Sequence, residues 1–231
     1  MKKLKIVFFA ALLPVLVSCN SSRFAVKYPD MVADADPVTA GNVEAVFERL
    51  FSSNLNKTDI EAIFYPRYNT VALSFKYQTI QYRLFWNETG RRKFAEALEL
   101  YKTDYFERNL IDKYRKTRSV YGKIKGQVEW ETFRFSKTHI SNPELELGYR
   151  FRNKLPFFTI LIRSAKEESD GGNNTELVEN QQINIYFTRA QAEELVKIFD
   201  QSFLLGLLGP KIVPETSPEK PEYDAYLEYN D

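Results

Sequence analysis

The chain has 231 residues, of which 15% are aromatic, and its 32 Lys and Arg nearly balance its 31 Asp and Glu. This composition excludes a collagen, a coiled coil and a wholly disordered chain, which lack so many aromatic and β-branched residues. A mean hydropathy of −0.40 and a single apolar run exclude a polytopic membrane protein, and the single cysteine excludes a disulfide scaffold.

The first residues have the pattern of an export signal. Lys2, Lys3 and Lys5 precede and flank the start of an apolar run over residues 6–17. A membrane-spanning helix needs about 20 apolar residues, so this run is too short to cross a bilayer. Its length is typical of the apolar region of a signal peptide, which predicts that the chain is exported.

The sequence LVSC, which ends at Cys19, resembles the lipobox of bacterial lipoproteins. The resemblance implies that residues 1–18 are a lipoprotein signal peptide and that Cys19 carries diacylglycerol and a fatty acid such as palmitate. The chain is then expected in the bacterial cell envelope, held to a membrane by this lipid. Asn20, in place of Asp, favours the outer membrane or the cell surface over the inner membrane. An ordinary cleaved signal with an incidental cysteine is the alternative.

Lipidation at Cys19 excludes two classes of function. The thiol is consumed, so thiol and redox catalysis are not expected. Removal of residues 1–18 takes away three lysines, which lowers the formal net charge from +1 to −2. Nucleic-acid binding domains are usually strongly basic, so the mature chain is not expected to bind nucleic acid.

Three segments follow the signal peptide. Residues 19–40 have no sustained apolar period, which predicts a flexible tether. Residues 41–208 have the length and patterning of a single α+β domain. Residues 209–231 are acidic and rich in proline, which predicts a disordered tail.

Helical and period-two patterns alternate in the first half of the domain. Apolar spacing predicts a helix over residues 42–51, and Thr58-x-x-Glu61 has the pattern of a capping box at a short second helical turn. Alternating apolar residues predict strands over 71–77 and 80–86, with a turn or bulge between them because the parity changes.

A long helix is predicted to begin at Asn87 or Gly90. The apolar residues expected on its buried stripe are Phe94, Leu98, Tyr101 and Tyr105, and the charged residues expected outside are Arg91, Arg92, Lys93, Glu96 and Glu99. This helix would cover one face of a sheet.

Period-two patterns return in the second half of the domain. The predicted elements are strands around 120–130 with bends at Gly122 and Gly126, a strand over 145–151, a turn over 153–156, a central strand over 157–162, a loop over 166–180 and a strand over 183–187. Thr188-x-x-Gln191 predicts the cap of a final helix. Its expected inward residues are Ala192, Leu195, Val196, Phe199 and Phe203.

These elements predict an α+β fold with antiparallel sheet packed against two or three helices, arranged as two strand-then-helix pseudo-repeats. The topology resembles the ββββα units of whirly and PUR-type single-strand nucleic-acid binders. The resemblance concerns the fold alone, since no PUR signature residues occur and an export signal argues against their function.

Two kinds of polar residue are candidates for chemistry. His139, the only histidine, has no motif that would supply an orienting carboxylate and a nucleophile, so a non-catalytic role is expected. The acidic pairs Glu144/Glu146 and Glu193/Glu194 are expected on solvated faces. No metal site and no cofactor are expected.

The densest basic run is the candidate polyanion-binding patch, formed by Lys113, Arg115, Lys116 and Arg118. Arg91, Arg92, Lys93, Lys123 and Lys125 are candidates to extend it. Such a patch would suit lipid headgroups or a cell-wall polymer. A charged helix end is the alternative interpretation.

Together these patterns predict a lipid-anchored envelope protein that is not an enzyme. Its expected role is that of a binding or assembly module that engages an envelope protein or a cell-wall polymer. The alternatives are a hydrolase of envelope glycan or cell wall that uses paired carboxylates, and a spacer between membrane and cell wall.

Overall fold

A computed structural model describes residues 31–48, 55–111, 119–131, 138–168 and 178–209. Within them, ten strands form one antiparallel sheet in the order β5-β8-β9-β10-β1-β2-β3-β4-β6-β7. The strands are β1 (Val38–Glu48), β2 (Leu55–Tyr65), β3 (Thr70–Tyr77), β4 (Ile80–Trp86), β5 (Ser119–Lys125), β6 (Gln127–Glu131), β7 (Thr138–Ser141), β8 (Glu144–Arg152), β9 (Leu155–Ile162) and β10 (Ile183–Phe187). The helices are α1 (Glu88–Phe106), α2 (Arg189–Phe199), α3 (Gln201–Gly206) and the 3-10 helix η1 (Pro66–Tyr68).

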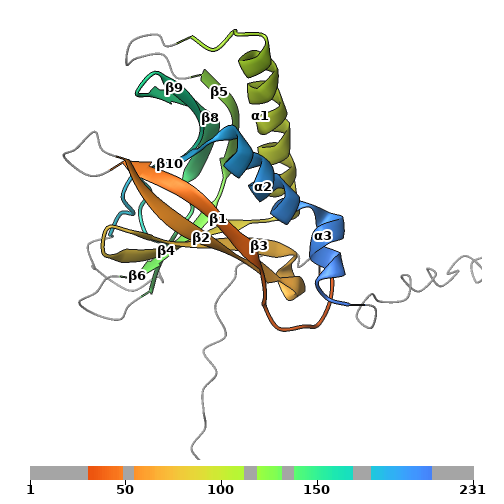
Figure 1. The fold of residues 1–231 in the computed structure, drawn as a ribbon. Coiled ribbons are helices and arrows are strands. Elements are labelled where there is room, and N and C mark those ends of the chain that lie inside the picture. Colours follow the sequence, from red (N-terminus) through yellow and green to blue (C-terminus); the bar gives the residue numbers. More distant parts are fainter. Residues whose placement is uncertain (1–30, 49–54, 112–118, 132–137, 169–177, 210–231) are drawn as a thin grey trace, which may run out of the picture.

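The sheet curls into a half-barrel whose open side is closed by α1 and α2 (Figure 1). The main core lies between the concave face and these helices, where Phe94 and Phe199 pack edge to face against each other. The predicted balanced α+β class is wrong, because the described chain is predominantly antiparallel β. The four-strand run β1–β4 precedes α1, and the run β8–β10 precedes α2.

The predicted helix over 42–51 is wrong, because strand β1 ends at Glu48 and begins at Val38, inside the predicted tether. Its core-facing residues alternate, with Val43, Ala45 and Phe47 buried in the main core. Residues 49–51 lie outside the described residues.

Gly41 marks a bulge in β1, where the register with β2 shifts. Its φ of 152° lies in the region that favours glycine, and a Cβ there would stand 3.1 Å from Ile198 Cδ1 of α2. The bulge therefore lets β1 pass close beneath α2.

The predicted capping box at Thr58 and Glu61 is also wrong, since both residues lie within strand β2. This strand is paired with β1 along its length and with β3 at its end. Its Ile60, Ala62 and Phe64 alternate toward the core. The local capping pattern was overridden by strand pairing on both edges.

The predicted hairpin of β3 and β4 is confirmed. Its strands pair from Val71↔Trp86 to Tyr77↔Ile80, and Gln78 at the turn has a left-handed φ of 59°. Because the turn has two residues, the change of parity places both apolar sets on the same concave face.

One bent hairpin supplies both ends of the sheet order. Strand β5 continues into β6 through Gly126, and β7 continues into β8. On one side of the bend β5 pairs with β8, and on the other side β6 pairs with β7. A Cβ at Gly126 would stand 2.6 Å from Leu145 Cδ1, so the bend predicted there requires glycine. The bend predicted at Gly122 coincides with a bulge.

Both helix starts that were predicted from capping residues are confirmed. Asn87 accepts from the Gly90 N–H at 2.8 Å, and Thr188 forms a capping box with Gln191. The prediction that the last helix continues to an inward Phe203 is wrong, because α2 ends at Phe199 and Phe203 is exposed on α3.

The strands predicted over 145–151, 157–162 and 183–187 are confirmed as β8, β9 and β10. Strand β9 is central, as its continuous apolar run predicted, and lies between β8 and β10. The loop predicted over 166–180 has its middle outside the described residues.

Candidate functional site

The residues predicted for lipidation and polyanion binding lie outside the described residues. Cys19 precedes the described chain, and the basic run falls between Ile111 and Ser119. The four members of that run are Lys113, Arg115, Lys116 and Arg118. Both sites therefore remain predictions.

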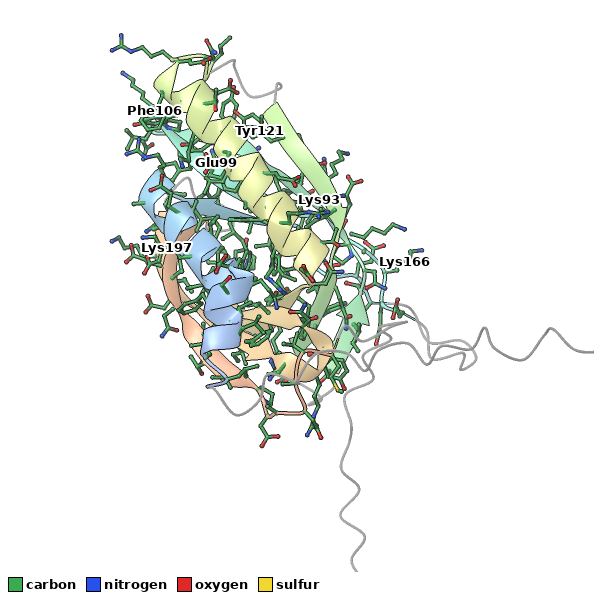
Figure 2. The ribbon with its side chains drawn as sticks, turned by 90° about the vertical axis from the view of Figure 1, so that its right-hand side faces the viewer. Lys93, Glu99, Phe106, Tyr121, Lys166 and Lys197 are labelled. Carbon is green, nitrogen blue, oxygen red and sulfur yellow. The ribbon has the colours of Figure 1, made fainter. Side chains whose placement is uncertain are left out.

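The residues that were expected to extend the basic patch do not form one basic surface. Arg92 lies 3.6 Å from Glu96 on the same helix, and Lys123 lies 2.8 Å from Glu144. Lys93 projects from the first half of α1 (Figure 2). Arg91 is buried, which corrects its predicted outward position.

Arg91 is a fully bonded cation inside the fold. Its guanidinium donates to the carbonyl oxygens of Asn69, Trp86 and Phe199 at 2.7, 3.2 and 3.2 Å. It also donates to Asn69 Oδ1 at 3.1 Å and to Gln201 Oε1 at 2.5 Å. Burial lowers the pKa of Arg91 to about 10, against the opposing pull of the Glu88 carboxylate. These bonds tie α1 to the β3 entrance and to the junction of α2 and α3.

His139 is a buried neighbour of the core. Its ring stacks on Trp130 at a centroid distance of 5.3 Å, and its Nδ1 lies 3.1 Å from Glu167 Oε2. The nearby Ser141 hydroxyl donates to Asn180 Oδ1 at 2.9 Å. The Ser141 hydroxyl thus donates its hydrogen to an amide oxygen, which is not the arrangement of a serine nucleophile activated by a histidine.

Cations lie close to Glu144, Glu146 and Glu193 of the two acidic pairs. Glu146 Oε1 accepts from Arg163 Nη2 at 2.6 Å, and Lys123 lies close to both Glu144 and Glu146. Glu193 lies 3.6 Å from Lys102. Among the residues that the structure describes, no group of three His, Cys, Asp or Glu could hold a metal ion. No helix in the same ranges is long and apolar enough to span a membrane.

A polar cluster that sequence reasoning missed lies on the outer, convex face of the sheet. We name Glu48, Arg150, Arg152 and Tyr186 the arginine–tyrosine cluster. The Tyr186 hydroxyl donates to Glu48 Oε2 at 3.0 Å and accepts from Arg150 Nη1 at 3.1 Å and Arg152 Nη2 at 2.9 Å. Arg152 Nη2 also lies 2.5 Å from Glu48 Oε2. One hydroxyl thus joins two guanidinium groups to one carboxylate.

Three strands position this cluster. Arg150 and Arg152 are two residues apart on β8, so they project from the same face. Tyr186 lies on β10 and is fully buried, with its ring edge to face against Phe157 of β9. The alternation of arginine with aromatic residues in β8 was visible in the sequence. The strand order β8-β9-β10-β1, which brings Tyr186 and Glu48 within reach of these arginines across β9, was not.

A cavity of about 320 Å³ lies next to Glu48, where β2 and β3 separate. Their pairing stops at Glu61↔Ser74, although both strands continue beyond that pair. Asn56 and Gln78 are among the lining residues. Phe47 and Tyr77 also line it, so the cavity presents both polar and apolar groups.

One end of the domain exposes a group of large apolar side chains, which we name the apolar end. Its members are Tyr105, Phe106, Ile111, Val120 and Leu155, which belong to the end of α1, the start of β5 and the turn between β8 and β9. Phe106 is the most exposed, at 64%. It lies at the tip of α1 in Figure 2.

A cation covers part of the apolar end. The guanidinium carbon of Arg189 lies 5.1 Å from the ring centroid of Tyr105 and 4.9 Å from that of Phe106. Both distances suit a cation–π contact. The apolar end therefore combines aromatic surface with positive charge.

The chain enters the domain at the opposite end. Val32 N–H donates to Pro66 O at 3.0 Å, and Asp34 pairs with Arg67 at 2.6 Å. This entry lies beside the first turn of α1, whereas Phe106 ends that helix, and a 19-residue helix is about 28 Å long. Figure 1 shows the same separation, with the end of α1 at the top and the start of β1 near α3 below.

Comparison with known proteins places the chain in a family. The family described as "Uncharacterised Treponema protein" matches residues 38–206. The chain is also similar to an uncharacterized protein of Treponema pallidum (strain Nichols), with 24% identity over 219 residues that cover 87% of this chain and 74% of that protein. No solved structure matches the chain. The matched region spans every strand of the sheet and both long helices, and the chain therefore belongs to the family of uncharacterised Treponema proteins.

Proposed function

We propose that the protein is a lipid-anchored, non-catalytic binding module of the bacterial cell envelope, with the apolar end as its binding surface. The observation that carries this proposal is the gathering of Tyr105, Phe106, Ile111, Val120 and Leu155 at the end of the domain farthest from the chain entry. Contiguous exposed apolar groups on a folded protein are typical of interaction sites.

The anchor is the lipid expected on Cys19. The lipobox supports it, and the match to Treponema proteins is compatible with a bacterial source. The part of the predicted tether between Cys19 and Val32 is about 12 residues long, and as a flexible coil it would have a root-mean-square reach of roughly 20 Å. We expect the domain to stand beside the outer membrane or at the cell surface, as the residue after Cys19 favours.

This attachment places the apolar end at the end of the domain that is farthest from the tether. The tether enters beside Pro66, and Phe106 lies at the far end of α1. A partner protein of the envelope can then reach the apolar end, which lies about one helix length from the point where the tether enters. We therefore expect the occupant to be a protein, not the surface of that bilayer.

The chemistry of the apolar end defines the partner surface that would fit it. Tyr and Arg are enriched in the energetically dominant centres of protein interfaces, and Tyr105 with Arg189 supplies that combination. Arg108 and Lys154 are exposed close by in the chain, next to Phe106 and Leu155. Glu107 is also exposed there, so the complementary surface is apolar at its centre and carries charges of both signs at its rim.

Site-directed photocrosslinking in cells tests the binding surface. A photoreactive phenylalanine analogue replaces Phe106 in one variant and Phe203 in the other, because Phe203 is also exposed but lies on α3. We expect a defined crosslinked species from position 106 and none from position 203. Equal crosslinking from both positions, or none from position 106, would contradict the proposal.

The intact mass of protein extracted from its native membranes tests the anchor separately. A mass that lacks residues 1–18 and includes diacylglycerol and a fatty acid is expected. A cleaved chain without lipid would contradict the anchor and would remove the argument against a bilayer as the occupant of the apolar end.

A further inference from the structure

We propose that the arginine–tyrosine cluster on the convex face binds a phosphate group through Arg150 and Arg152. This inference does not depend on the apolar end or on the lipid anchor. It rests on charge balance, on preorganisation and on the geometry of the guanidinium group.

Charge balance distinguishes this cluster from the other ion pairs of the outer face. Arg83 faces Glu129 at 3.5 Å, one cation to one carboxylate. Lys123 and Arg163 face Glu144 and Glu146, two cations to two carboxylates.

In the cluster, by contrast, two guanidinium groups share the single carboxylate of Glu48. That carboxylate lies 2.5 Å from Arg152 but 3.8 Å from Arg150. The described residues thus leave one positive charge in excess, and it resides mainly on Arg150.

Arg150 also retains hydrogen-bonding capacity. A guanidinium carries five N–H donors, and the partners that the described chain gives Arg150 are the Tyr186 hydroxyl and the distant Glu48 carboxylate. Its side chain is 38% exposed, so the remaining donors are open to solvent. An anion can therefore bind there without displacing a protein group.

The cluster is ordered before any anion binds. Tyr186 is fully buried against Phe157, and its hydroxyl accepts from both arginines. Arg152 also stands over the Tyr186 ring, with 5.4 Å from its guanidinium carbon to the centroid. Fixing the guanidinium groups in advance reduces the entropy lost on binding.

The geometry favours phosphate over a single carboxylate. A guanidinium presents a planar fork that matches two oxygens, and two forks on neighbouring positions of one strand can engage different oxygens of one tetrahedral group. Glu48 already occupies the position where a planar carboxylate meets Arg152. The excess donors on the Arg150 side suit an anion with more oxygens and more charge.

Calorimetric titration of the full mature protein in detergent, at low ionic strength, tests the site. Inorganic pyrophosphate is the first probe, and glycerophosphoglycerol, the soluble headgroup of an anionic lipid, is the second. Saturable binding of either probe is expected. Preference for the first would indicate a soluble phosphate ligand, and preference for the second a lipid headgroup.

Three variants assign the binding to the cluster. Arg150→Gln is expected to weaken binding about tenfold, because it removes the charge-assisted bonds. Glu48→Gln is expected to strengthen it about threefold or more, since it removes the competing carboxylate. Arg83→Gln, on the same outer face but in a balanced pair, is expected to leave the affinity unchanged.

The increase expected for Glu48→Gln separates binding from a merely structural role. A purely structural cluster would lose order in both variants, so both would bind less or not at all. Absence of saturable binding by either probe, or an equal loss in Arg83→Gln and Arg150→Gln, would overturn the proposal. Circular dichroism of each variant verifies that the fold is retained.

Discussion

The protein has two arginine centres in opposite environments: Arg91 is the inner centre, and the arginine–tyrosine cluster is the outer centre. Arg91 lies inside the half-barrel, where its N–H groups meet neutral oxygens from three carbonyls and two side-chain amides. Arg150 and Arg152 lie on the outer face, where they share one carboxylate and one hydroxyl. Every N–H donor of the inner centre is hydrogen-bonded to the protein, whereas Arg150 of the outer centre keeps donors that are open to solvent.

This difference separates a structural role from a binding role. A buried cation is tolerated only when its hydrogen bonds are satisfied, so Arg91 has no donor left for a ligand. An exposed cation can have donors without a protein partner at little cost, because water accepts hydrogen bonds from them. Saturation of the donors thus indicates which arginine holds the fold together and which one can meet a partner.

The strongest test of the inner centre is Arg91→Met. The substitution fills most of the volume but leaves several buried oxygens without donors, and each costs about 1–3 kcal/mol. We expect the free energy of unfolding to fall by about 3 kcal/mol or more, measured by denaturant titration. Arg92→Ala is the matched control, since Arg92 is exposed and should cost less than about 0.5 kcal/mol.

Arg91→Lys would sharpen this result. A lysine keeps the charge but offers three donors on one atom, which cannot reach oxygens that surround a planar fork. We expect it to recover only a minor part of the lost stability. Full recovery would mean that charge alone matters and would break the contrast between the two centres.

Asn69 is the next most sensitive position of the inner centre. It has a left-handed φ of 46°, its Oδ1 accepts from Arg91, and its Nδ2 donates to Glu88 at 3.1 Å. Asn69→Ala is expected to cost about 2 kcal/mol, from lost hydrogen bonds and from backbone strain. Asn69→Gly removes the strain alone and should recover about half of the loss in the same denaturant titration. Equal costs for the two variants would show that φ at this position is unimportant.

The sequence patterns predicted the elements with strong local signals. The capping residues Asn87 and Thr188 predicted where the two helices begin, and the alternation of apolar residues on either side of Gln78 predicted the β3–β4 hairpin. Strand β1 was predicted as a helix because it is apolar on both faces. Val43 and Phe47 point to the core while Val46 packs with Tyr186, so its spacing satisfies a helical period as well.

The arginine centres could not be predicted from local patterns. The acceptors of Arg91 lie up to 110 positions away, at Gln201, and Glu48 is 138 positions from Tyr186. A charged residue in the first turn of a helix is ordinarily solvated, and for that reason Arg91 was predicted to point outward. Only the register of the sheet brings these groups together.

Tyr186→Phe tests the outer centre with a smaller expected effect. The change removes the hydroxyl shared by Arg150 and Arg152 but keeps the ring against Phe157, so we expect a loss of about 1 kcal/mol. Tyr82→Phe is the matched control. Tyr82 is buried, and its hydroxyl has no hydrogen-bond partner within the described ranges, so this variant should be neutral or slightly stabilising. A loss as large as that of Arg91→Met would make the outer centre as structural as the inner one.

The smallest expected effect is a change in pH dependence at the balanced pair of Arg83 and Glu129. Burial raises the pKa of Glu129 above its ordinary value of 4.5, although Arg83 opposes the shift. The folded state then holds more protons than the unfolded state just above pH 4.5, so the free energy of unfolding should fall as pH rises through that window. Glu129→Gln should remove the contribution of this group to the slope. Between pH 4 and about 7 that contribution changes the free energy of unfolding by less than about 1 kcal/mol, and denaturant titrations at several pH values measure it. A slope unchanged in the variant would mean that the attraction of Arg83 cancels the effect of burial, and that this balanced pair leaves Glu129 with the same pKa in the folded and unfolded states.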